Sequence, residues 1–130
     1  MRINLASVLV DDQEKALRFY TDVLGFVKKT EFPVGDHRWL TVVSPEDPEG
    51  TELQLAADDD PAAKAFRKAT FDQGRPAVMF FSDDVSADYE RMKAAGAEFT
   101  KPPTEVTGST IATVGDGCGN LVQITQLKRW

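Results

Sequence analysis

The chain has 130 residues, 42% of them hydrophobic and 28% charged, which is typical of one soluble globular domain. Its formal net charge of −6 argues against nucleic acid and anionic membrane surfaces as partners, because both attract basic patches. The apolar runs are too short to cross a bilayer, no signal peptide precedes the first of them, and a lone cysteine permits no internal disulfide. Together these features predict a cytoplasmic protein without a membrane partner.

The first half of the chain is predicted to form a strand, a helix and three further strands. Residues 3–10 are apolar and partly β-branched, which is typical of a strand. Asp11 or Asp12 can cap the helix that follows, and Gly25 can end it. The apolar stripe of this helix recurs at helical spacing and consists of Ala16, Leu17, Tyr20, Val23 and Leu24. The three further strands are expected at residues 26–32, 39–43 and 51–56.

Residues 57–75 are predicted to connect this half to a second one through a short helix, which Asp60 caps and Pro61 begins. The pattern then restarts with a strand at 76–82 and a helix that ends at Gly96. The remaining strands are expected at residues 97–100, 110–114 and 120–125, with a glycine-rich turn at 115–119.

The two halves repeat the same landmarks in the same order. Leu5 lies seven residues before Asp12, and Ala77 lies seven before Asp84. The capping aspartate precedes the helix-ending glycine by 13 residues in the first half and by 12 in the second. A glycine that opens the last strand follows after 25 and 23 residues. We therefore predict an α+β fold in which one domain contains two βαβββ modules, at about residues 1–56 and 76–126.

The residues around these landmarks resemble the vicinal oxygen chelate superfamily, which includes glyoxalase I, extradiol dioxygenases, fosfomycin-resistance enzymes and bleomycin-resistance proteins. The likeness covers nearly the whole chain, and its most specific part is the Phe-Tyr and Leu-Gly-Phe pattern within residues 19–26. The segments that carry it are residues 8–12, 16–26, 83–85, 93–96 and 116–124. The resemblance implies two curved sheets that form a half-open barrel around a pocket, usually in a homodimer.

Metal-dependent members of this superfamily have ligands, mostly His and Glu, on the first and last strand of each module. Carried over to this chain, the first-strand positions fall on Leu5 and Ala77, whose side chains have no donor atom. The last-strand position of the second module falls on Gln123, and that of the first module falls on either Glu52 or Gln54. Because at most one carboxylate remains, we predict no metal site and no cofactor.

The same positions predict a pocket for an organic ligand. Ser7, Met79 and Phe81 share the faces of Leu5 and Ala77 by strand alternation, and Arg38 or Trp39 is expected at the rim. The candidate ligand-binding residues are Ser7, Arg38, Trp39, Glu52, Gln54, Met79, Phe81 and Gln123. A mostly apolar pocket with aromatic walls, two amides and one carboxylate suits binding by stacking and a few hydrogen bonds.

Three other features are given ordinary structural roles. His37, the only histidine, follows a turn and is expected to be an exposed residue rather than a ligand or a base. Cys118 has no basic neighbour in sequence to lower its pKa, so we expect a bystander thiol rather than a nucleophile. The acidic run at residues 58–60 lacks the alternating spacing of a calcium loop and is attributed to helix capping and solvation.

Three functions are compatible with this pocket. The first hypothesis is a metal-independent small-molecule-binding protein that sequesters its ligand without reaction, as the resemblance to bleomycin-resistance proteins implies. The second is an enzyme of the same fold, of the lyase, isomerase or dioxygenase type, with Glu52 as the base or with a metal site placed elsewhere. The third is a dimeric regulatory module with a vestigial pocket. No catalytic residue is assigned, and the ligand and the arrangement of the modules in a dimer are left open.

Overall fold

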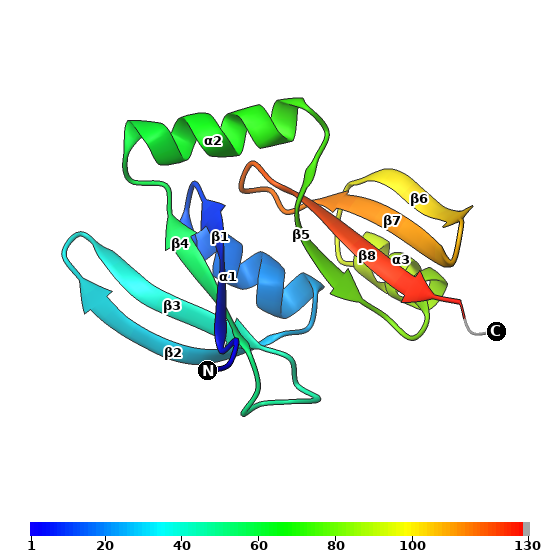
Figure 1. Ribbon diagram of the computed structural model, residues 1–130, viewed down its shortest axis with the longest axis horizontal. Helices are drawn as coiled ribbons and strands as arrows, with labels where there is room; N and C mark the ends of the chain where they lie inside the picture. Colours follow the sequence, from blue (N-terminus) through cyan, green and yellow to red (C-terminus); the bar gives the residue numbers. More distant parts are fainter. Residues whose placement is uncertain (129–130) are drawn as a thin grey trace.

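The computed structural model describes residues 1–128, which form two four-stranded sheets and three α-helices (Figure 1). The first sheet has the order β1-β4-β3-β2 and consists of β1 (Leu5–Val10), β2 (Val27–Val34), β3 (His37–Val43) and β4 (Glu52–Ala57). The second has the order β5-β8-β7-β6 and consists of β5 (Pro76–Phe81), β6 (Phe99–Val106), β7 (Ser109–Gly115) and β8 (Leu121–Leu127). Within these residues neither sheet closes into a barrel, and no helix is long and apolar enough to cross a membrane.

The two sheets have the same strand pairings, as the internal repeat predicts. β1 pairs in parallel with β4, and β5 pairs in parallel with β8, while the other neighbours are antiparallel. Parallel neighbours need a long connection, and here a helix and a hairpin supply it in each half. The predicted α+β fold with two βαβββ units is therefore confirmed.

The predicted helix ends are confirmed at the level of single hydrogen bonds. Asp12, Asp60 and Asp84 each accept a hydrogen bond from the backbone N–H three residues later, at 2.8 to 3.0 Å. The backbone hydrogen bond from Lys15 is the main reason that the pKa of Asp12 is lowered. At the other ends, Gly25 and Gly96 have φ values of +93° and +95°, which a side chain would strain.

The first helix differs from the regular helix that the sequence predicts. It begins as α1 (Gln13–Arg18) and continues as a π-helical segment, η1 (Phe19–Val23). There the N–H of Leu24 donates to the carbonyl of Phe19, five residues back. The Thr21 hydroxyl also donates to the Leu17 carbonyl at 2.6 Å, a side-chain bond that competes with the regular backbone pattern.

The connecting helix α2 (Pro61–Asp72) lies on the surface, across the ends of both sheets in Figure 1. None of its residues is buried, and Arg67 attaches it to the sheets. The Arg67 Nε donates to Asp58 Oδ2 at 2.8 Å, and one of its terminal nitrogens donates to the Gly119 carbonyl at 3.5 Å. Asp58 is only 4% exposed, so the prediction that solvation explains this acidic run is wrong for Asp58, which pairs with a cation.

Strand β6 is longer than the strand that the sequence predicts. It continues through two prolines, which argue against a longer strand. Pro102 and Pro103 lack an N–H and would interrupt an interior strand. In the structure β6 is an edge strand with register shifts on both sides of Lys101, so the prolines need no second partner strand.

The two sheets share one hydrophobic core, which lies on the faces that the helices cover. The third α-helix, α3 (Val85–Ala94), contributes Val85 and Met92. The buried members of this core are Val8, Val10, Ala16, Tyr20, Leu40, Val42, Leu55, Val85, Met92, Ala112, Val114, Cys118, Val122 and Ile124. The opposite faces of both sheets therefore point away from the core.

A buried hydrogen-bond network around Asp116 joins the two halves. The Tyr20 hydroxyl donates to Asp116 Oδ2 at 2.9 Å, and the N–H groups of Cys118 and Asn120 donate to Oδ1 at 2.7 and 3.1 Å. Burial, and then the Asp116 charge, raises the pKa of Tyr20 well above 10.0. The same two causes raise the pKa of Cys118 to about 12, so Cys118 is a buried, protonated thiol at neutral pH.

Candidate functional site

Each sheet buries one face and leaves the other open. In the first sheet Val8, Leu40 and Leu55 are buried, and side chains alternate along a strand, so their neighbours project from the opposite face. This first open face consists of Ser7, Thr30, Phe32, Trp39, Thr41, Glu52 and Gln54. The second open face consists of Met79, Phe81, Thr104, Ile111, Thr113, Gln123 and Thr125.

Glu52 begins β4 and is held on the first open face by two hydroxyl groups. Its Oε1 accepts hydrogen bonds from Thr41 Oγ1 at 2.6 Å and from Thr30 Oγ1 at 3.2 Å. No Lys or Arg of residues 1–128 lies within 4.0 Å of this carboxylate, and Oε2 accepts no hydrogen bond from them. The carboxylate is therefore fixed in position and keeps one oxygen for a ligand.

Ser7 and Gln54 lie opposite each other on the parallel strands β1 and β4. The Ser7 hydroxyl donates to Gln54 Oε1 at 2.7 Å. Because its oxygen is engaged in this way, the Gln54 amide group has its N–H donors available. The sequence leaves open which of Glu52 and Gln54 takes the ligand position and expects both on one face. In the structure they share that face, as a carboxylate acceptor beside an amide donor.

The second open face is more apolar. Met79 and Phe81 are 56% and 66% exposed, which is unusual for side chains of this size. Between them and the hairpin of β6 and β7, Gln123 Nε2 donates to Thr125 Oγ1 at 3.1 Å and contacts Met79 Sδ at 3.8 Å. No hydrogen bond or ion pair among residues 1–128 connects this group to Ser7, Glu52 or Gln54.

Arg38 lies on the other side of β3, away from the first open face. Its guanidinium forms ion pairs with Glu14 at 2.6 Å and with Glu31. The Gln13 side chain bonds both the N–H and the carbonyl of Arg38. The hydrogen bond that Arg38 donates to Glu14 is the main reason that the pKa of Arg38 is raised. The structure thus places Arg38 where it fastens β3 to α1, apart from the other candidate residues.

Trp39, in contrast, projects from the first open face. Its ring stacks on Phe32 with a centroid distance of 6.3 Å and an interplanar angle of 13°. Phe32 is 48% exposed, so this pair presents an aromatic surface beside Glu52 and Gln54. His37, two residues earlier, is exposed as expected, with its Nε2 3.7 Å from Asp59.

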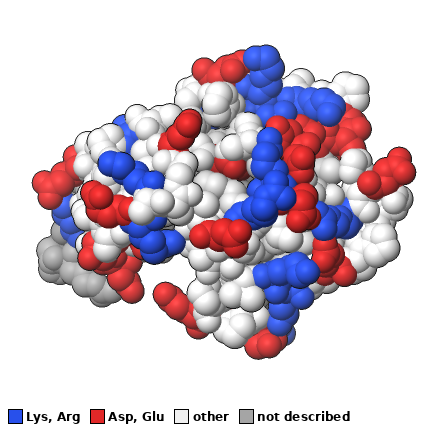
Figure 2. Space-filling view, turned by 180° about the vertical axis from the view of Figure 1, so that it is seen from behind, with Lys and Arg blue, Asp and Glu red and all other residues white. Residues whose placement is uncertain are grey.

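On the molecular face shown in Figure 2, basic and acidic side chains are interspersed rather than separated. Ion pairs between such side chains occur in the described chain, for example Lys28 with Glu31 at 2.8 Å and Lys68 with Asp72 at 2.7 Å. Nucleic acids bind continuous basic surfaces, and this face offers none.

The match to a protein-family model decides the family of this chain. The model of the Glyoxalase/Bleomycin resistance protein/Dioxygenase superfamily matches residues 2–124. The chain belongs to this superfamily. The resemblance proposed from residues 19–26 and the second-half glycine turn is thereby confirmed.

Relatives within the superfamily include proteins of similar length. The chain is 48% identical to the uncharacterized protein YurT of Bacillus subtilis (strain 168) over 126 residues, 97% of this chain and 99% of that protein. Among solved structures it is similar to UcmS2, with a TM-score of 0.83 and 28% identity over 96% of this chain and 97% of the other. It is also similar to TnmS3, an antibiotic binding protein from Streptomyces sp. CB03234, with a TM-score of 0.78 and 27% identity over 98% and 97%.

The residues at the superfamily's metal-ligand positions do not fit a divalent cation. Leu5 and Ala77 are hydrocarbons, and Gln123 is a neutral amide. Glu52 is the single carboxylate of the set, and one of its oxygens already accepts two hydroxyls. Residues 1–128 contain no group of three or more His, Cys, Asp and Glu side chains that could hold a metal ion. No chemical step through a metal is therefore derived.

Sequence reasoning missed Thr30, Thr41 and Phe32. The alternation of Thr30 and Phe32 along β2 could have indicated a shared face, but the pairing of β2 with β3 shifts register between Lys28 and Thr30. This register shift determines which hydroxyl bonds Glu52, and the sequence composition does not predict such a shift.

Proposed function

We propose that this protein binds a small organic molecule on its open faces and holds it without chemical change. The observation that carries the proposal is the first open face, where Glu52 is fixed by two threonine hydroxyls beside the exposed Phe32–Trp39 stack. A few fixed polar groups on an apolar, aromatic surface are typical of small-molecule sites. The similarity to TnmS3, an antibiotic binding protein, supports the same function.

We also propose that a second copy of the chain completes the site. The second open face carries large exposed apolar side chains, among them Met79 and Phe81. Surfaces of this kind commonly mark contacts with another protein. A partner whose second open face covers the first open face of this chain would enclose a ligand between Glu52 and the partner's Gln123.

The compartment we propose is the cytoplasm. The single cysteine, Cys118, is buried as a protonated thiol, which suits a reducing environment.

Fluorescence titration tests the binding proposal, because a ligand that stacks on Trp39 quenches its emission. The chain has two tryptophans, so a Trp130→Phe protein isolates the signal of Trp39. The probes are proflavine, a polycyclic aromatic cation, and anthraquinone-2-sulfonate, a polycyclic anion. We expect quenching by proflavine at micromolar concentration, and about tenfold weaker binding of proflavine after Glu52→Gln, because the fixed carboxylate loses its charge.

Glu90→Gln is the matched control, since Glu90 is an exposed carboxylate on α3, away from both open faces. Mass spectrometry of the recovered probe separates binding from catalysis. If the wild type alters the probe chemically and Glu52→Gln does not, the result would favour the enzyme hypothesis instead. Equal affinities of the wild type and Glu52→Gln would remove Glu52 from the site.

A further inference from the structure

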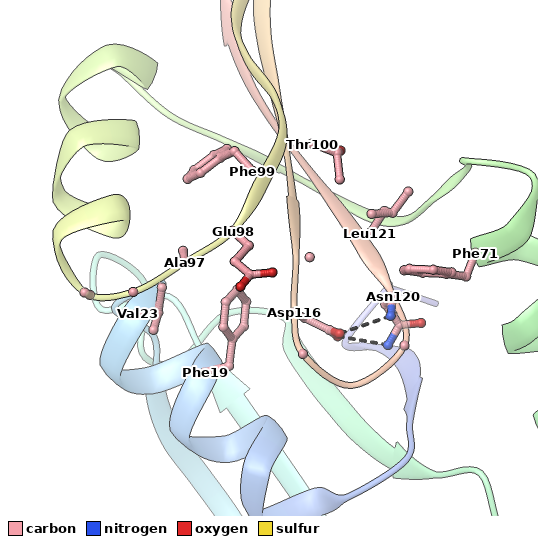
Figure 3. Close-up of a pocket in the computed structure, with 15 residues that line it drawn as sticks. Phe19, Val23, Phe71, Ala97, Glu98, Phe99, Thr100, Asp116, Asn120 and Leu121 are labelled. Atoms are coloured by element: carbon pink, nitrogen blue, oxygen red, sulfur yellow. Dashed lines mark hydrogen bonds between the residues drawn. The ribbon is translucent and has the colours of Figure 1, made fainter.

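A cavity lies away from the open faces. It has a volume of about 680 Å³, within the range of small-molecule sites, and lies where η1, the end of α2, the start of β6 and the 115–120 turn meet (Figure 3). Its apolar walls consist of Phe19, Val23, Phe71, Ala97, Phe99 and Leu121. It shares no residue with either open face, so a ligand here would be independent of the function proposed above.

Asn120 supplies an acceptor without a donor at this cavity. The residue is only 4% exposed, and its Nδ2 donates to the Leu9 carbonyl at 2.7 Å and to Asp116 Oδ2 at 2.9 Å. Only the NH₂ end of an amide can serve two acceptors, so these bonds fix its orientation. The oxygen is then directed away from Asp116, toward the side of Phe71 in Figure 3, and no donor of residues 1–128 bonds it.

Glu98 supplies a negative charge to the same cavity. Its carboxylate extends from the start of β6 toward Phe19 and the 115–120 turn (Figure 3). No Lys or Arg of the described chain lies within 4.0 Å of this carboxylate. Asp116, the other carboxylate of the lining, already accepts four hydrogen bonds from Tyr20, Cys118 and Asn120. Glu98 and Asn120 thus both offer acceptors between aromatic walls.

We propose that this cavity is a second binding site and that its ligand is a small hydrophobic amine. A protonated amine supplies the hydrogen-bond donors that the Asn120 oxygen and the Glu98 carboxylate lack. The hydrocarbon part of the ligand packs against Phe71, Phe99 and Leu121. The faces of the phenylalanine rings add attraction for a cation.

The test uses three probes of nearly equal shape: 2-phenylethylamine, 2-phenylethanol and 3-phenylpropanoate, which are cationic, neutral and anionic. Each is titrated into the ¹⁵N-labelled full-length chain while the backbone amide NMR signals are followed. We expect the amine to shift the signals of residues 97–100 and 115–121, with a dissociation constant on the order of 1 mM for so small a probe. The alcohol should bind about threefold more weakly, and the anion more weakly still.

Four variants sharpen the test. Glu98→Gln should remove the roughly threefold preference for the amine over the alcohol, whereas Glu90→Gln, which removes an exposed charge outside the cavity, should keep it. Phe71→Ala should weaken binding of both probes about fivefold, and Phe71 is 43% exposed, so its truncation should leave the fold intact. Glu52→Gln should have no effect, which separates this site from the first open face. Shifts confined to the open faces, equal binding of the three probes, or an amine preference that survives Glu98→Gln would overturn the proposal.

Discussion

At the scale of single residues, the structure shows how a few polar side chains are buried with their hydrogen bonds satisfied. Asp116 is 1% exposed and accepts four hydrogen bonds, two from backbone N–H groups and two from side chains. Among residues 1–128, no buried side-chain nitrogen or oxygen lacks a hydrogen-bond partner. Such satisfaction matters because a buried polar group without a partner costs about 1–3 kcal/mol.

Removing the Tyr20 hydroxyl should destabilise the protein. In Tyr20→Phe the buried Asp116 carboxylate loses one of its donors, and we expect the free energy of unfolding to fall by about 1.5–3 kcal/mol. The measurement is urea denaturation at pH 7. Tyr89→Phe is the control, because no hydrogen bond of the Tyr89 hydroxyl is found in the described chain, and its change should stay below about 0.5 kcal/mol. Equal losses in the two variants would contradict the role given to the network.

The raised pKa of Cys118 predicts a loss of stability in alkali. Its pKa is about 12 in the folded protein and 9.0 in the unfolded reference, so the folded state keeps a proton that the unfolded chain releases. The resulting stability is fully present below pH 9 and is lost as the pH rises toward 12, by at most about 1.4 kcal/mol per pH unit. Tyr20, whose pKa is also raised, adds to this loss above pH 10.

Unfolding free energies measured at intervals from pH 7 to pH 11 test this prediction. Cys118→Ala should show a smaller slope than the wild type between pH 9 and 10, where Tyr20 still contributes little. The same slope in both proteins would mean that the thiol does not carry the effect.

At the scale of elements, the sequence predicts helix caps and the repeat well, because these depend on local chemistry. The aspartate caps and glycine ends follow from backbone groups a few residues apart. The lengths of β2 and β6, and the π-helical segment η1, were not predicted. They depend on register shifts and tertiary packing, which lie outside any sequence window.

The candidate site, too, could be predicted only in part from the sequence. Strand alternation predicts that Ser7, Met79 and Phe81 share the faces of Leu5 and Ala77. It does not give the strand register, which places Ser7 opposite Gln54 and Met79 opposite Gln123. Alternation could not decide between Arg38 and Trp39, because the sequence does not say which face of β3 meets the helix. The acidic side chains of Glu14 and Glu31, distant in sequence from Arg38, settle that choice.

The attachment of α2 predicts unequal effects at two glycines of the 115–120 turn. A Cβ on Gly119 would overlap the Arg67 guanidinium, and the residue has φ +84°. Gly117 has φ +73° but no heavy atom within 4 Å of its would-be Cβ. Gly117→Ala should cost about 1–2 kcal/mol of backbone strain alone. Gly119→Ala should cost about 1 kcal/mol more, because Arg67 must leave the buried Asp58 carboxylate.

Thermal unfolding of the two alanine variants measures this difference. In an Arg67→Met background the additional loss at Gly119 should largely disappear, since the displaced ion pair is already absent. A difference that persists there would place the strain in the turn itself.

At the scale of the whole molecule, the arrangement of the two sheets determines where the two open faces lie. The helix-covered faces meet in one core, and the open faces lie on the opposite sides of the two sheets. Glu52 belongs to one open face and Gln123 to the other, and no hydrogen bond of residues 1–128 joins them. In the proposed assembly a second copy would bring the two residues into one pocket.

The proposed homodimer can be tested by matched substitutions. Phe81 on the second open face and Phe66 on α2 are 66% and 68% exposed, so replacing either by glutamate removes a similar exposed apolar surface. Phe81→Glu would bury a charge in the proposed interface, and we expect sedimentation at micromolar concentration to show a monomer of 14.3 kDa. Phe66→Glu lies on the surface helix and should remain dimeric. A wild-type protein that sediments as a monomer, or a Phe81→Glu dimer as stable as that of Phe66→Glu, would contradict assembly through the open faces.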